Sequence, residues 1–307
     1  MHGWKKFLEL IKQTFGNFSQ ANGSLMAAAL AYYALFSISP LLVLTVTLSR
    51  WILGSTGLID AFIVQLSTFL PPAVTDTLRN LVESYMNNAF SSFPAIISLA
   101  IMLFGASIVF AQLKTALNQI WGLATKPERN LFNFIRTQGL AFASVMFLGF
   151  LLVAMTFSTT ILNSIRSSLV GNTPLIDFTL PYLDLPLSAV VFTVIFALLF
   201  KILPDASVAW KDIWLGALVT AVAFTIGESL LGLYLSRNNF LSAYGVASSL
   251  VVLMVWIYYS SQILLFGAAF TKTYAELYGS KLHPNASAML TKRMNANTSK
   301  NEPHSYE

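Results

Sequence analysis

The sequence predicts an all-α, polytopic membrane protein with six transmembrane helices and both termini in the cytoplasm. An N-terminal interfacial helix and two short amphipathic helices on the outer side complete the predicted fold. The first observation is composition: 56% of the 307 residues are hydrophobic and 10% are charged, against roughly 45–50% and about 25% in soluble domains. A chain this apolar cannot bury its apolar surface in one soluble core. The second and third observations are the lengths of the apolar windows and the placement of the basic residues.

Six apolar windows are each long enough to cross a hydrocarbon core of ~30 Å as a helix, which takes ~18 residues or more. They lie near residues 25–49, 93–113, 138–163, 185–203, 213–235 and 246–271. A closed β-barrel is the other structure that pairs every backbone group inside a membrane, but its strands alternate between apolar and polar residues. The run AVVFTVIFALLF, from Ala189 to Phe200, does not alternate. The windows are therefore predicted to be helices.

The basic residues give the orientation. With a cytoplasmic N-terminus, 14 of the 18 Lys and Arg residues fall inside, and the four outside are Arg50, Arg79, Arg166 and Arg237. Cytoplasmic loops carry such an excess of positive charge. The pattern predicts both termini in the cytoplasm, with an even number of spans.

The segments at the two ends differ from the predicted membrane domain, residues 21–275. Residues 1–20 lack the apolar core of a cleaved signal peptide. Instead, apolar residues recur there at helical spacing with the lysines beside them, which predicts a helix lying in the headgroup layer; the apolar residues are Trp4, Phe7, Leu8, Ile11, Phe15 and Phe18. Residues 276–307 are polar with few aromatic residues, and this composition predicts a disordered cytoplasmic tail.

Two amphipathic stripes lie between the first two predicted spans, one in residues 59–69 and one in residues 74–85. Pro71 and Pro72 separate them, so we predict two short helices with a proline hinge. Amphipathicity shows only that one side of each helix is apolar. Two interpretations stay open: helices resting on the membrane surface, which is the more common arrangement, or a lid over a pathway.

The residue inventory argues against several kinds of catalytic site. The chain has no cysteine, which excludes thiolate nucleophiles and Cys-based zinc sites. Its histidines are His2, His283 and His304, all in terminal segments. Hydrolytic nucleases and Ser-His-Asp enzymes need clustered His, Asp or Glu side chains, and no Gly-rich phosphate loop is present. We predict a protein that is not an enzyme, without catalytic residues, cofactors, metals or a nucleic-acid partner.

Glu228 is the one ionisable side chain that falls well inside a predicted span, in the segment FTIGESLLGLYL. An intramembrane carboxylate costs ~2.5 kcal/mol or more by insertion scales unless it is paired, protonated or hydrated. We therefore expect it to face the interior of the helix bundle. A carboxyl group that is neutral at pH 7 is suited to a proton-coupled carrier. Alternatively, a protonated carboxyl can form a hydrogen bond to a neighbouring helix and have a structural role only. Both interpretations stay open.

The other candidate residues share the depth of Glu228 or face the interior by their polarity. In the first span, Pro40 removes a backbone hydrogen bond, and Ser37 and Ser39 lie beside it. The freed carbonyl at Phe36 would then be available to a ligand or water, although a packing kink satisfied by these serines is the more common reason for a proline in a membrane helix. The remaining candidates are Thr156, Ser249 and Tyr259.

Four segments resemble the YihY/virulence factor BrkB family of bacterial inner-membrane proteins, over about residues 21–275. They are AAALAYYALFSISPLLVL, LKTALNQIWGL, LPDASVAWKDIWLGAL and YGVASSLVVLMVWIYYSSQILLFGAAF. The resemblance implies a six-span fold in the orientation given above and a link to envelope processes. It also carries an older label of ribonuclease, which the histidine positions do not favour. This chain departs from the family pattern at Glu228, where relatives have lysine, and at Ala269, where relatives have glutamate.

Together, the residues and the resemblance predict an inner-membrane protein that transports or accommodates a lipidic or amphiphilic envelope component. The predicted partners are the lipid bilayer and such a component or its precursor. The alternative is a membrane scaffold or assembly factor without a transported substrate, in which the polar groups only join helices. The sequence does not indicate the oligomeric state.

Overall fold

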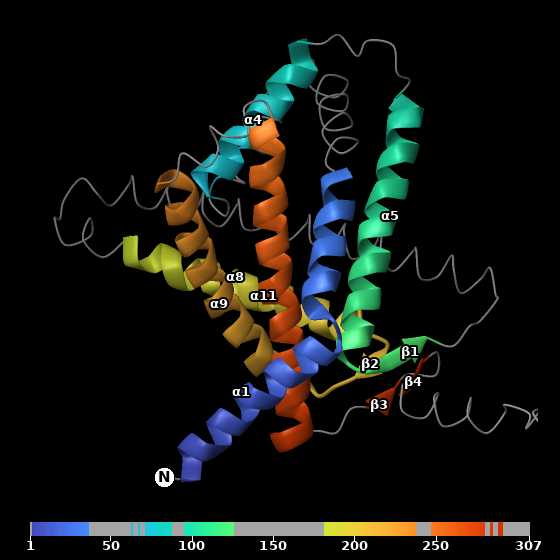
Figure 1. Ribbon diagram of the computed structural model, residues 1–307, viewed down its shortest axis with the longest axis vertical. Helices are drawn as coiled ribbons and strands as arrows, with labels where there is room; N and C mark the ends of the chain where they lie inside the picture. The colour runs from blue at the N-terminus through green and yellow to red at the C-terminus, as the bar shows by residue number, and fades with distance from the viewer. Residues whose placement is uncertain are drawn as a thin grey trace, which may run out of the picture. The chain divides into compact units, whose positions relative to one another are not determined.

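The computed structural model describes residues 2–36, 63, 67, 71–87, 95–125, 181–237, 247–279, 283–284 and 288–290. These residues are mainly helical (Figure 1). The helices are α1 (His2–Gln20), Gly23–Phe36, α4 (Pro72–Asn87), α5 (Ala95–Ile120), α8 (Pro181–Ile202), α9 (Trp210–Arg237) and α11 (Ser248–Tyr278). The strands β1 (Leu123–Thr125), β2 (Ala206–Ser207), β3 (His283–Pro284) and β4 (Ala288–Leu290) are two or three residues long.

Two of the described helices are long and apolar enough to cross a membrane, over Trp210–Leu235 and Leu250–Tyr278. At 1.5 Å per residue, their 26 and 29 residues exceed a hydrocarbon core of ~30 Å. Shorter apolar helices cover Gly23–Phe36 and Ala189–Ile202. The predicted span at 138–163 lies outside the described residues. Six spans and their orientation therefore stay predictions.

The ends of these helices follow from local sequence. Asn22 has a left-handed φ of 53° directly after α1, a conformation that Asn tolerates at a helix end. Gly122 has a φ of 70°, and its N–H bonds the Gln119 carbonyl at 3.0 Å, so a glycine ends α5 in the same way. Pro72 begins α4, where the missing N–H costs nothing.

The chain divides into two compact units. Unit 1 comprises residues 1–24, 113–222 and 264–307, and unit 2 comprises residues 25–112 and 223–263. The boundaries fall within the helix Gly23–Phe36 and within α5, α9 and α11. Each unit is described separately below.

In unit 1, α1 packs along the C-terminal part of α11 (Figure 1). Asn17 Nδ2 donates a hydrogen bond to Thr273 Oγ1 at 2.9 Å, and the Phe18 ring lies edge-on to Phe266 with centroids 5.7 Å apart. Leu10 and Thr14 are buried. Phe15 and Phe18 of the apolar stripe noted in the sequence thus touch α11, while Leu8 of the stripe is exposed. The headgroup location of the stripe stays a prediction.

Two antiparallel strand pairs in unit 1 were not predicted. β1 pairs with β4, in the register Leu123↔Leu290, Ala124↔Met289 and Thr125↔Ala288. β2 pairs with β3, with Ala206 opposite Pro284. Parts of residues 276–307, predicted to be disordered, are therefore ordered: α11 runs to Tyr278 and two strands follow. Pairing with distant segments orders this region, and composition does not report such pairing.

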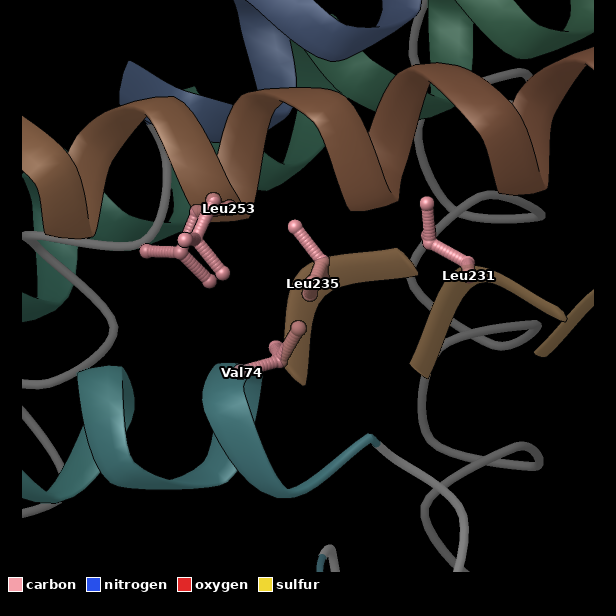
Figure 2. Close-up of a cluster of buried hydrophobic side chains, with 5 residues drawn as sticks. Val74, Leu231, Leu235 and Leu253 are labelled. Carbon is pink, nitrogen blue, oxygen red and sulfur yellow. The ribbon is translucent and has the colours of Figure 1, made fainter. Parts of the chain in front are cut away.

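In unit 2, a buried apolar cluster joins α4, α9 and α11. Its members are Val74, Leu231, Leu235, Val252 and Leu253, and Figure 2 shows four of them pointing toward one another from the three helices. Leu78 and Leu81 of α4 pack against it. The apolar stripe of α4 therefore contacts protein, and both interpretations, a helix on the membrane surface and a lid over a pathway, stay predictions. Of the helix predicted at 59–69, the structure describes Ile63 and Ser67.

Candidate functional site

Glu228 lies on the side of α9 that packs against the rest of unit 2. Its neighbours one turn away are Phe224, which is half-buried, and Leu231, which is buried. The opposite side of α9 exposes a row of large apolar side chains, including Leu218, Val222 and Ile226. An exposed apolar row of this length is typical of a membrane or partner contact. In a membrane protein that row faces lipid, and the half-buried Glu228 faces the protein.

The residue before Glu228 is a close contact between α9 and α11. A Cβ atom on Gly227 would lie 2.6 Å from Ile263 Cδ1 and 2.9 Å from Tyr259 Cε1. Both distances are shorter than side chains allow, so glycine permits the two helices to approach here. Tyr259, a predicted site residue, is half-buried and packs against the apolar cluster under α4. The structure thus brings Tyr259 and the Gly227–Glu228 step of α9 into the same region.

Phe224 and Leu231, one turn before and after Glu228 along α9, are apolar. Within the part of the chain that the structure describes, the Glu228 carboxylate makes neither a hydrogen bond nor an ion pair. Burying a carboxylate without a partner is costly in a membrane. Its low exposure and lack of a partner among the described residues make Glu228 the strongest functional candidate in unit 2.

The other predicted site residues are less informative. Ser37, Ser39, Pro40 and Thr156 lie outside the described residues, and Ser249 is within α11 but its side chain is not described. Among the predicted site residues, the side chains that the structure describes are those of Glu228 and Tyr259.

A second polar group lies in unit 1, and the sequence analysis did not single it out. Lys114 Nζ of α5 is 2.9 Å from Asp205 Oδ1, in the loop between α8 and α9. Asn118 Nδ2 donates to Asp205 Oδ2 at 3.0 Å, and the Asp205 N–H donates to Asn118 Oδ1 at 2.9 Å. We call these three residues the α5 clasp. Asn118 is 3% exposed, so its amide depends on these partners.

Lysines on other elements support the same end of unit 1. Lys272 Nζ of α11 donates to the Ile120 carbonyl, at the end of α5, at 3.2 Å. Lys201 Nζ donates to the Val208 carbonyl at 2.7 Å and lies 5.5 Å from the Trp210 ring centroid. These lysines satisfy carbonyl groups that a helix end or loop leaves open. The clasp residues come from two of the segments that suggested the family, LKTALNQIWGL and LPDASVAWKDIW. The charged residues of these segments were the sequence signal that could have identified the clasp.

The chain is similar to several known bacterial proteins. A UPF0761 membrane protein of Teredinibacter turnerae is 26% identical over 274 residues, covering 88% of this chain and 61% of the relative. One of Tolumonas auensis is 28% identical over 256 residues, covering 82% and 80%. The putative ribonuclease-like protein YfkH of Bacillus subtilis is 22% identical over 271 residues, covering 85% and 93%.

This chain spans about three fifths of the length of the Teredinibacter relative. No solved structure matches it. The family model described as Virulence factor BrkB matches residues 14–290, which include the clasp, Glu228 and Tyr259. The chain therefore belongs to the BrkB family of membrane proteins.

Proposed function

We propose that this protein accommodates an amphiphilic component of the bacterial envelope in the interior of a six-span bundle and moves it between the two sides of the inner membrane. Both termini lie in the cytoplasm in this proposal. The observation that carries it is Glu228, a half-buried carboxylate in an apolar helix, without a partner among the described residues.

The surroundings of Glu228 suit such a component chemically. A carboxylate can exchange protons or bind a polar headgroup, and a transport cycle could supply the partner that the described residues lack. The neighbouring side chains, such as Phe224 and Leu231, offer apolar surface to an acyl chain. The Tyr259 hydroxyl adds a hydrogen-bonding group in the same unit.

Helix α4 would act as a cover on the outer side of this site. Its buried residue Val74 packs against Leu231 and Leu235 of α9, one and two turns beyond Glu228. Its opposite side is polar, and Asp76, Arg79 and Glu83 are exposed. A helix with this arrangement separates water from the apolar ends of α9 and α11. Movement about Pro71 and Pro72 would open that cover.

The test is reconstitution of the purified full chain into liposomes that carry a fluorescent phospholipid in one leaflet. We expect faster movement of the lipid between leaflets than in protein-free liposomes, and a dependence on a pH gradient. Glu228→Gln should abolish the acceleration, while Glu276→Gln, a change at an exposed glutamate of α11, should not. Equal rates with and without protein, for phospholipids and isolated envelope precursors alike, would contradict the proposal.

A scaffold without a transported substrate is the second candidate, favoured by how closely α9 and α11 pack at Gly216, Gly227 and Gly267. Glycine contacts of this kind hold membrane helices together without any transport role. Under this alternative, Glu228→Gln leaves envelope phenotypes unchanged, and specific proteins co-purify with the wild-type chain.

The proposal assigns no catalytic activity. The ribonuclease-like description belongs to the 22% identical relative. In this chain the histidines are at positions 2, 283 and 304, and acid–base cleavage of RNA needs paired groups of that type. Among the described residues, no three His, Asp or Glu side chains lie together. RNA cleavage by the pure protein, surviving removal of contaminating nucleases, would overturn this assignment.

A further inference from the structure

Helix α1 presents two different apolar faces. The first packs on α11: Leu10 is 6% exposed and Thr14 is fully buried, while Asn17 bonds Thr273. These residues are spaced by four and three positions, so they share one side of the helix. The Tyr278 hydroxyl donates to the Lys6 carbonyl at 3.2 Å, which fixes the N-terminal part of α1 as well.

The second face is exposed although it is apolar. Leu8 is 51% exposed and Phe15 is 61% exposed. Phe15 also touches Phe266 of α11 edge-on, with ring centroids 5.0 Å apart, but this contact leaves more than half of its side chain exposed, as is the case for Leu8. Large apolar residues gathered on one exposed helix face mark a contact with a membrane or another protein.

Lysines border the second face on the side away from α11. Lys5 precedes Leu8 by three positions and Lys12 follows it by four, so all three lie on one ridge of the helix. Both lysines are exposed. A lysine beside exposed apolar residues can extend its charged end to lipid phosphates while its stem stays on apolar surface. Apolar burial with basic residues at the border is the pattern of helices that lie on anionic membranes.

We propose that the second face of α1 lies in the headgroup layer of anionic phospholipids, with Leu8 and Phe15 among the acyl chains and Lys5 and Lys12 on the lipid phosphates. The partner is the membrane rather than a second copy of this chain, because lysines at the border complement lipid phosphates. This inference goes beyond the proposed function, since it holds equally for a carrier and for a scaffold.

Quenching by brominated lipids tests this placement. The chain has no cysteine, so Leu8→Cys in the full-length protein gives one site for a bimane fluorophore. The labelled protein is placed in nanodiscs of phosphatidylcholine and phosphatidylglycerol in which either one lipid or the other is brominated. We expect quenching from both lipids, stronger per mole from brominated phosphatidylglycerol, with a local enrichment on the order of fivefold for each lysine.

The lysine variants supply the control. Lys5→Gln with Lys12→Gln should remove the preference for phosphatidylglycerol while quenching persists. Lys6→Gln should preserve it, because Lys6 is equally exposed but lies on another side of the helix. No quenching by either lipid would show that protein covers this face, and a second copy of the chain would be the first candidate. Equal quenching by both lipids, or a preference that survives the double substitution, would also overturn the proposal.

Discussion

The Thr271 side chain of α11 occupies the space where a Cβ atom on Gly216 of α9 would lie, and Thr220 of α9 bears the same relation to Gly267 of α11. Each threonine hydroxyl donates to a carbonyl of its own helix four residues earlier, Thr220 to Gly216 at 2.7 Å and Thr271 to Gly267 at 2.8 Å. Both hydroxyls are therefore satisfied, and the hydroxyl oxygen of each threonine is the atom nearest to the opposite glycine position. The two helices carry a reciprocal Gly-x-x-x-Thr contact.

This contact predicts that Gly216→Val destabilises the protein. The added side chain overlaps Thr271, and overpacking of this kind costs about 1–3 kcal/mol. Thermal unfolding in detergent should show a lower midpoint. Gly232→Ala on the same helix is the matched control, because its added Cβ would lie 3.6 Å from Pro71 Cβ, an ordinary contact. A double variant, Gly216→Ala with Thr271→Gly, exchanges the small and the large residue and should recover part of the lowered unfolding midpoint. Equal midpoints for Gly216→Val and Gly232→Ala would contradict the contact.

The α5 clasp predicts a larger effect at Asp205 than at an exposed acid. Asp205→Ala removes the partner of Lys114 and the acceptor of the buried Asn118 Nδ2, while Asn118 Oδ1 keeps the backbone N–H of residue 205. The loss should lower the free energy of unfolding by about 2 kcal/mol. The value is below that of a fully buried pair, because the Lys114 side chain is 25% exposed. Unfolding in detergent by a denaturant series measures it. Glu276→Ala should change little, and a similar small change for Asp205→Ala would mean that the clasp does not stabilise the fold.

The cover formed by α4 predicts a difference in reactivity between its two sides. Val74 is fully buried, whereas Arg79 on the same helix is exposed. In the purified protein, a thiol at Val74→Cys should therefore react far more slowly with a maleimide than one at Arg79→Cys. Denaturant should equalise the two rates. If Val74→Cys reacts as fast as Arg79→Cys in the folded protein, α4 does not pack on α9 and α11.

The positions of the described apolar helices could be predicted from apolar windows, but the C-terminal ends of α5 and α11 could not. The window at 246–271 corresponds to α11, yet α11 continues to Tyr278. There, Thr273 accepts a hydrogen bond from Asn17, and Lys272 donates one to the Ile120 carbonyl. A prediction from hydropathy ends the span at the first charged residue. The helix itself continues further where its polar side chains find partners.

The same limit applies to α5 and to the clasp. The window at 93–113 ends before Lys114, but α5 runs to Ile120 because Lys114 and Asn118 pair with Asp205 across the fold. Such a pairing joins residues 87 positions apart, and a single sequence does not report it. Glu228 could be identified from the sequence, because an acidic residue within an apolar window stands out even when its contacts are unknown. The short strands carry too few residues for a periodic signal.

The central claim is that Glu228 lies in a part of the bundle that water or a polar substrate can enter. The direct measurement is labelling of Glu228→Cys in intact cells with a membrane-impermeant thiol reagent. Arg79→Cys, on the exposed side of α4, is the positive control. Leu230→Cys, 56% exposed on the apolar side of α9, is the lipid-facing control, where a thiol stays protonated and unreactive.

We expect Glu228→Cys and Arg79→Cys to be labelled and Leu230→Cys to stay unlabelled. This result would show an aqueous route to the packed side of α9, as transport requires. Labelling of Arg79→Cys alone, with all three variants folded and in the membrane, would contradict the account. Glu228 would then be a packed carboxyl group, and the scaffold would become the better explanation of the protein.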